Sequence, residues 1–243
     1  MILPDSFSLL LSLLIAAGPI EPAAKRVECV VLLHGLGRTE FSMSRIENEL
    51  EKSGYVVVNE TYPSLSKDIP ELSEVVGSGI EACRSKSATS IHFVTHSMGG
   101  ILVRVYFQTH TIPEAKRMVM LGPPNHGSEV VDEHHDDWWF RLATGPAGQQ
   151  LATSGDRSIP ITLNPIPLEI GIIAGTESID PLLDDTLPRP NDGKVSVQSA
   201  MLPEMKDFVT IPVDHTFMVY SATVIGHVKA FLKDGKFSRL VWN

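Results

Sequence analysis

The sequence predicts an α/β fold with a mostly parallel sheet of about six strands and helices on both faces. Two observations predict it. Six mostly apolar runs are typical of strands that are buried on both sides. Segments with apolar residues at helical spacing lie between several of these runs. This alternation favours a parallel sheet with helices on both faces.

Each element is expected in chain order. The strands are expected at residues 27–35, 55–62, 90–95, 117–122, 169–175 and 208–213. The helices are expected at residues 40–53, 68–84, 98–109 and 217–232. No internal repeat is visible, and 243 residues fit one α/β domain of ordinary size.

The amino-acid composition argues against a disordered chain and against a nucleic-acid-binding protein. The hydrophobic content of 43% is enough for a sizeable core and is not typical of a disordered chain. The net charge of −9 argues against a nucleic-acid partner, because phosphates would require a basic face.

The first residues differ from the rest. Residues 7–18, FSLLLSLLIAAG, are apolar but shorter than the ~20 residues that a membrane span needs. They match the core of a secretory signal, although Asp5 precedes them without any Lys or Arg. A buried N-terminal helix is the alternative. We assign residues 1–26 to a signal peptide or anchor and 27–243 to the main domain. We expect export to the periplasm or the medium, or anchoring at a membrane surface by residues 7–18.

Residues 125–168 interrupt the alternation and are expected to be irregular, as a cap or lid. Trp138 and Trp139, with Phe140, would form its apolar underside. The two tryptophans would either contact substrate or hold the lid to the body. The acidic run DEHHDD, residues 132–137, lacks the fixed spacing of metal ligands, so we expect a solvated lid surface and no metal.

A serine stands where the third strand meets the next helix, within Thr95-His96-Ser97-Met98-Gly99. Functional groups gather at the carboxyl ends of parallel strands. The segment resembles the Gly-x-Ser-x-Gly turn that exposes a nucleophile, with Thr95 in place of the first glycine.

A serine nucleophile needs a base, and the base needs an orienting acid. His215 follows the last expected strand, and His126, after the fourth, is its rival. Asp192 lies on a Pro-Asn-Asp-Gly turn before a strand-like run, which favours it as the acid. The acids available between the fifth strand and His215 are Asp180, Asp184, Asp185, Asp192 and Asp207.

Two backbone amides are expected to form an oxyanion hole. One belongs to Met98, the residue after the serine. The other belongs to Leu36, in the loop HGLGR after the first strand.

The motifs VVLLHGLGR, VTHSMGGILVR, LGPPNHGSEVVD, NDGKVSV and DHTFM together resemble bacterial α/β-hydrolases of the triacylglycerol lipase and esterase kind. The resemblance covers about residues 27–233. It implies serine hydrolysis of a small-molecule ester or lipid without a cofactor, with Ser97, Asp192 and His215 as the triad. It also implies that the loop containing His126 lies near the site without supplying the base. Larger lipases of this kind carry a structural calcium site, whose ligands we do not identify in this chain.

The same resemblance implies that the first and third strands are neighbours. Cys29 would then lie close to Cys83, and export would permit a disulfide between them. Two buried free thiols are the alternative. Other functions for such a chain are a thioesterase or acyltransferase on the same fold, or a member that binds without catalysis.

Overall fold

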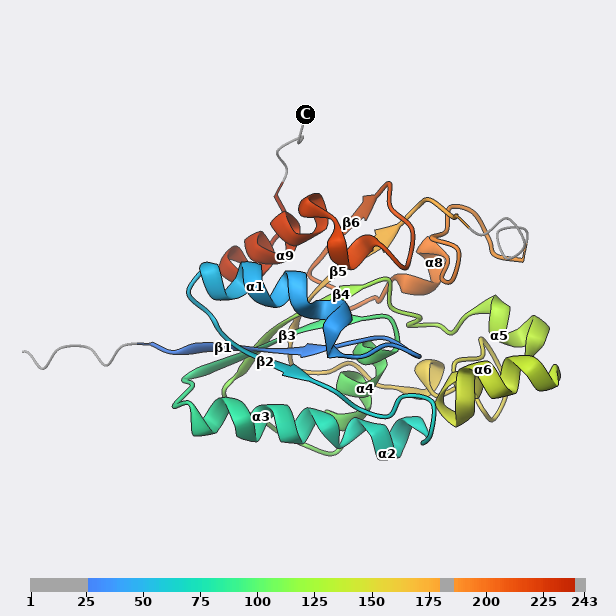
Figure 1. The fold of residues 1–243 in the computed structure, drawn as a ribbon, viewed down its shortest axis with the longest axis horizontal. Helices are drawn as coiled ribbons and strands as arrows, with labels where there is room; N and C mark the ends of the chain where they lie inside the picture. Colours follow the sequence, from blue (N-terminus) through green and yellow to red (C-terminus); the bar gives the residue numbers. More distant parts are fainter. Residues whose placement is uncertain (1–25, 180–185, 239–243) are drawn as a thin grey trace, which may run out of the picture.

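A six-stranded parallel sheet forms the centre of the computed structural model, which describes residues 26–179 and 186–238 (Figure 1). Its strand order is β2-β1-β3-β4-β5-β6, and every neighbouring pair is parallel. All carboxyl ends of the strands therefore lie at one edge. The strands are β1 (Glu28–Leu33), β2 (Val56–Glu60), β3 (Ser90–His96), β4 (Ala115–Leu121), β5 (Glu169–Gly175) and β6 (Asp207–Ile211).

Helices cover both faces of the sheet, as the sequence predicts (Figure 1). One face carries η1 (Glu40–Met43), α1 (Ser44–Lys52), η3 (Met218–Tyr220) and α9 (Ala222–Asp234). The other carries α2 (Ile69–Ser73), α3 (Val75–Ser85) and α4 (Met98–Tyr106). Three of the expected helices are each divided in two. The helix expected at residues 40–53 is η1 followed by α1, and α2 and α3 flank Glu74. The last is η3 followed by α9, which Ser221 caps by accepting from the Val224 amide.

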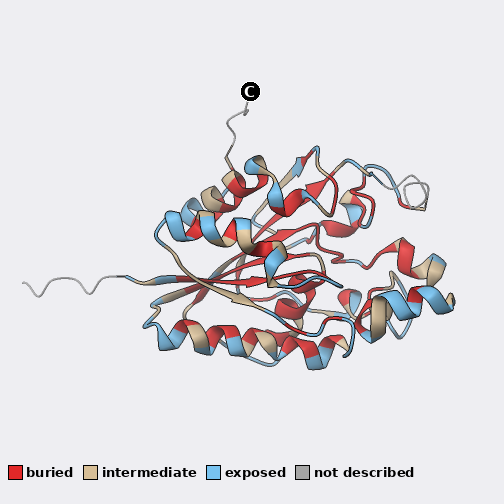
Figure 2. Cartoon of the chain, viewed as in Figure 1, coloured by how far each residue is buried: buried red, intermediate tan, exposed pale blue. Residues whose placement is uncertain are grey.

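The core has two layers because side chains alternate along each strand. In β1, Val31 and Leu33 face α3 and α4, whereas Val30 and Leu32 face α1 and α9. Figure 2 shows the buried residues concentrated on the strands and on the sides of the helices that face them. The sheet is thus a rigid base for the loops at its carboxyl edge.

Two expectations about secondary structure are wrong, one for residues 125–168 and one for the residues after Asp192. Residues 125–168 contain α5 (Glu129–His134), α6 (Trp138–Gln149) and η2 (Pro160–Thr162), so nearly half of this insertion is helical. The strand-like run after Asp192 is instead a turn followed by α8 (Val197–Ala200), because Ser196 caps that helix by accepting from the Ser199 amide. Short apolar runs are ambiguous between the two states.

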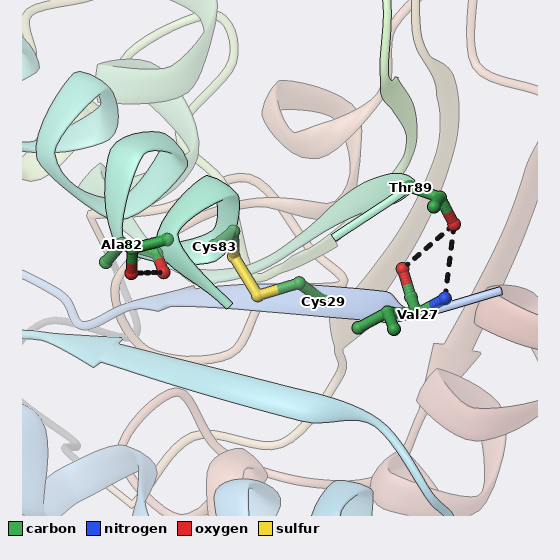
Figure 3. Close-up of a disulfide and its surroundings, with 6 residues drawn as sticks. Val27, Cys29, Ala82, Cys83 and Thr89 are labelled. Atoms are coloured by element: carbon green, nitrogen blue, oxygen red, sulfur yellow. Dashed lines mark hydrogen bonds between the residues drawn. A yellow bond between two sulfur atoms is a disulfide. The ribbon is translucent and has the colours of Figure 1, made fainter. Parts of the chain in front are cut away.

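A disulfide joins Cys29 of β1 to Cys83 of α3, with the two Cα atoms 5.8 Å apart (Figure 3). Both residues are fully buried. Next to it, the Thr89 hydroxyl pairs with the backbone of Val27, through both its N–H and its carbonyl, at 3.2 Å each (Figure 3). These links fasten the start of β1 to α3 and β3, at the edge of the sheet opposite the carboxyl ends.

The expected signal or anchor segment, residues 1–26, falls almost wholly outside the described residues. Across residues 26–179 and 186–238, none of the helices has the length and apolar character that a bilayer crossing requires.

Candidate active site

Ser97 occupies a strained turn between β3 and α4. Its φ of 54° and ψ of −125° are rare for a residue with a side chain. Such a conformation costs of order 1–3 kcal/mol and persists only where its surroundings enforce it. Here the Ser97 N–H donates to the Leu121 carbonyl of β4 at 2.8 Å. The turn lifts the serine to the edge of the sheet, where its side chain is partly exposed.

Glycines make this tight turn possible. A Cβ on Gly99 would lie 2.7 Å from the Leu33 carbonyl oxygen and 2.8 Å from that of His34. A Cβ on Gly100 would lie 3.1 Å from the hydroxyl of Thr95. Thr95, which departs from the usual motif, is therefore accommodated because Gly100 has no side chain.

Asp192 and His215 form a hydrogen-bonded pair at the same edge. The His215 Nδ1 lies 2.8 Å from the Asp192 Oδ2. The other carboxylate oxygen, Oδ1, accepts from the Lys194 amide at 3.0 Å and the Val195 amide at 2.8 Å. The His215 amide donates to the Asp192 carbonyl at 2.9 Å. This arrangement fixes the imidazole so that Nδ1 donates to the carboxylate and Nε2 is left to accept a proton.

His96 packs against His215. Its Nε2 lies 2.9 Å from the His215 carbonyl oxygen, and the ring centroids are 4.8 Å apart. Burial, and then the nearby His215, hold the pKa of His96 well below its ordinary value. His96 is therefore neutral and donates from Nε2 to that carbonyl.

The loop after β1 brings Leu36 to the cavity that Ser97 also lines. The Arg38 amide donates to the Gly35 carbonyl at 3.2 Å, and Gly37 has a φ of 66°, as a type II turn requires at that position. Among the described residues, neither the Leu36 N–H nor the Met98 N–H has a hydrogen-bond partner. Both N–H groups are therefore free of partners among the described residues, one in the loop after β1 and one directly after Ser97.

A cavity of about 350 Å³ opens over these groups. Ser97, Leu36 and His215 line its floor. The insertion supplies the roof through α5 and α6, with Val130, Val131, Trp139 and Phe140. The size and the apolar roof suit a small organic ligand or an acyl chain.

The two lid tryptophans differ. Trp139 lines the cavity and contacts the rings of His134 and Phe140. Trp138 does not line it, and its side chain is 75% exposed. Of the two expected substrate contacts, only Trp139 is in position to touch a ligand in this cavity.

The rival candidates lie elsewhere. His126 is absent from the cavity lining, and its Nδ1 pairs with the Ser199 carbonyl at 3.1 Å. The Asp207 carboxylate accepts from the amides of Phe208 and Phe237 at the opposite edge of the sheet. Asp180, Asp184 and Asp185 lie outside the described residues.

The acidic run of the lid makes contacts within the lid. Asp132 accepts from the Thr153 amide at 2.9 Å, His134 pairs with Asp137 at 2.9 Å, and Arg141 pairs with Asp136 at 3.0 Å. Across the described ranges, no group of three or more His, Cys, Asp or Glu residues could hold a metal ion.

Gly122 is a site residue that sequence reasoning missed. It follows β4 with a φ of 52°, and a Cβ there would lie 2.9 Å from the Asp192 Oδ2 and 3.0 Å from the His215 Nδ1. The glycine thus leaves room for the Asp–His pair. The sequence feature that could have pointed to Gly122 is its position directly after an expected strand, within MLGPP. His96, which contacts His215, is the other site residue that the sequence did not single out.

The sequence matches no protein-family model and no curated protein sequence. Solved structures do match. Mature lipase BlEst2 from Bacillus licheniformis aligns with a TM-score of 0.72 at 19% identity, over 88% of this chain and 94% of that one. The metagenomic carboxyl esterase MGS0156 aligns with a TM-score of 0.62 at 17% identity, over 85% and 71%. A lipase-esterase related protein from Clostridium acetobutylicum aligns with a TM-score of 0.54 at 15% identity, over 85% and 95%. The chain has the α/β-hydrolase fold.

Proposed function

We propose that this α/β-hydrolase fold carries a serine carboxylic-ester hydrolase that acts through an acyl-enzyme. The observation that carries the proposal is the common cavity of Ser97 and His215, with Asp192 bonded to the far side of the imidazole. The names of the structural neighbours, lipase and carboxyl esterase, agree with it. Ser97 is the nucleophile, His215 the general base and acid, and Asp192 the group that orients His215.

The reaction follows from this arrangement. The Ser97 Oγ attacks the ester carbonyl carbon while His215 Nε2 takes the hydroxyl proton. The tetrahedral intermediate then expels the alcohol, which receives that proton from His215. Water attacks the acyl-serine with His215 again as base, and the carboxylic acid leaves as Ser97 recovers its proton.

The Leu36 and Met98 amides stabilise the oxyanion of both tetrahedral intermediates. They point from the β1 loop and from the start of α4, and neither is engaged by another described residue. The loss of one such donor typically costs ~10²–10³ in rate. Since side-chain substitutions leave both amides in place, the test of the mechanism falls on the triad.

A fluorophosphonate probe tests the proposal. The wild-type protein should be labelled at Ser97, and the Ser97→Ala variant, matched for folding by circular dichroism, should not. A protein that binds esters without catalysis would escape labelling, which would overturn the proposal. Nitrophenyl esters of increasing acyl length, alongside emulsified triglyceride, then separate an esterase from a lipase. Thioesters and alcohol acceptors test the thioesterase and acyltransferase alternatives.

We also propose that the chain acts in an oxidising compartment outside the cytoplasm. The apolar residues 7–18 and the Cys29–Cys83 disulfide support this placement. Fractionation of cells that express the full chain, with thiol alkylation of the recovered protein, tests it. Reduced thiols in a cytoplasmic fraction would contradict it.

A further inference from the structure

Two cations lie at the mouth of the Ser97 cavity. Arg38, in the turn after β1, and Lys194, two residues after Asp192, both line the cavity and are both exposed. None of the described residues that line it is an Asp or a Glu. The chain as a whole carries 29 acidic and 20 basic residues, so this entrance has the opposite sign from the net charge.

Among the described residues, no acidic side chain pairs with either cation. The Arg38 Nη2 donates to the Thr216 hydroxyl at 3.3 Å, which is a neutral partner. Two histidines outside the proposed triad also line the cavity: His96 is buried, and His134 pairs with Asp137 at 2.9 Å.

The two carboxylates that are close in sequence to Lys194 and Thr216 already have hydrogen-bond partners. Asp192 bonds to His215 and to two amides, and it is buried beneath the imidazole. Asp214 is buried and accepts from the amides of Thr216 and Phe217 at 2.9 and 3.2 Å. Neither lines the cavity, so the part of the chain that the structure describes supplies no acid there to compensate the two cations.

The hydrogen bond of Arg38 indicates which part of an ester substrate, the acyl chain or the alcohol, lies next to the guanidinium. Its partner Thr216 follows His215, which protonates the departing alcohol in the proposed reaction. The residues that the insertion adds to the lining, Val130, Val131 and Phe140, are apolar and suit the acyl chain. Arg38 therefore stands beside the leaving group.

We infer that this enzyme selects esters whose leaving group carries a negative charge, a phosphate or a sulfonate, through Arg38 and Lys194. The inference rests on the proposed function and names the substrate class of the same site. Guanidinium and ammonium groups are the usual protein partners of such anions. Because both side chains are exposed to solvent, each ion pair with the substrate adds little binding energy. We expect each cation to raise kcat/KM for an anionic ester over a cationic one about three- to fivefold.

Matched aryl butyrates provide the test, one with a para sulfonate and one with a para trimethylammonium group. The measured quantity is the ratio of their kcat/KM values, in the wild type and in Arg38→Gln and Lys194→Gln. Each variant should lower the anion-to-cation ratio about three- to fivefold, and 0.5 M NaCl should lower the wild-type ratio because it screens exposed charges. Lys236→Gln, an exposed cation at the opposite edge of the sheet, should leave the ratio unchanged.

The outcomes separate the two proposals. Equal losses on both esters in Arg38→Gln and Lys194→Gln, with an unchanged ratio, would show that these residues only support the fold and would overturn the inference. A wild type that hydrolyses both esters without preference would also overturn it and leave the proposed function standing. Failure to hydrolyse any ester would overturn both.

Two sources of such an anion can be distinguished. Faster hydrolysis of monobutyryl glycerol phosphate than of monobutyrin would support a phosphorylated glycerol ester. Faster hydrolysis of butyryl coenzyme A than of its neutral N-acetylcysteamine analogue would support a nucleotide-bearing thioester. Equal rates within both pairs would count against the inference.

Discussion

The Nε2 of His96 donates a hydrogen bond to the backbone carbonyl of His215, 2.9 Å away, so the residue before Ser97, the proposed nucleophile, holds the proposed base in place. The bond links the end of β3 to the loop after β6 across β4 and β5. Since burial keeps His96 neutral, the donor stays in place across the pH range of an esterase assay.

Replacement of His96 tests this positioning role. His96→Phe removes the donor and leaves the buried His215 carbonyl without a partner, which costs ~1–3 kcal/mol. We expect about a tenfold fall in kcat for a nitrophenyl butyrate. His96→Gln keeps an N–H at a similar reach and should retain more activity. Equal kcat values for the two variants at equal melting temperatures would show that the ring only fills space.

Gly122→Ala should disable the Asp–His pair. Its new methyl group would lie 2.9 Å from the Asp192 Oδ2 and 3.0 Å from the His215 Nδ1, at a φ of 52°. We expect a loss of at least about 10²-fold in kcat/KM, because a misplaced catalytic group costs on that order. Gly54→Ala is the matched control: its φ is 91°, and no atom lies within 4 Å of the added carbon. That control should lose stability but keep its activity.

Trp139→Ala should change the preference among acyl chains, and Trp138→Ala should not. Trp139 lines the cavity roof, whereas Trp138 is 75% exposed outside it. Each acyl CH₂ that the roof buries is worth ~0.8 kcal/mol. The ratio of kcat/KM for octanoyl over acetyl esters should therefore fall in Trp139→Ala. A uniform loss over acetyl, butyryl and octanoyl esters, with a large drop in melting temperature, would make Trp139 a purely structural residue.

His92 should make the protein less stable in acid. Its ring is 2% exposed and neither nitrogen has a hydrogen-bond partner in the described residues. Burial, followed by Arg117 and Lys116, lowers its pKa from 6.5 to about 4. The unfolded chain binds the proton below pH 6.5 and the folded one does not, so stability falls from pH 6.5 down to about 4. At pH 5 the loss is roughly 2 kcal/mol. Urea unfolding at pH 8 and pH 5 should show it, and His92→Leu should reduce that difference.

The disulfide should contribute strongly to stability. It closes a loop of 54 residues between Cys29 and Cys83, for which the chain-entropy estimate is about 4 kcal/mol. Cys29→Ala/Cys83→Ala should unfold at a markedly lower urea concentration than the oxidised wild type. Reduced wild type should resemble the double variant. Since both cysteines are far from the cavity, kcat in the absence of denaturant should change little.

Much of the fold could be predicted from the sequence because the apolar runs of the strands and the helical spacing of apolar residues were long and regular. The buried strands β1 and β3 and helix α9 showed clear periodicity or continuous apolar runs, and the strand–Ser97–helix turn has its own motif. The lid was harder to predict. Helix α6 contains Pro146 and a kink at Gly145, where φ is 61°, so its pattern is not that of one helix. Gly122 and the bond of His96 arise from contacts between distant segments, which no local pattern encodes.

The loops that follow β1, β3, β4, β5 and β6 each bring a residue to the cavity or to its Asp–His pair, from Leu36 to His215. No single described segment of the chain contains Ser97, Asp192 and His215 together. Contacts between residues so far apart form late in folding, because the entropy of closing long loops comes first. A nascent or damaged chain in which β6 is unpaired would keep most of its helices, but His215 would not be held at the cavity. The proposed ester hydrolysis would therefore require β6 to be paired with β5, and its rate would measure how much of the chain has completed the sheet.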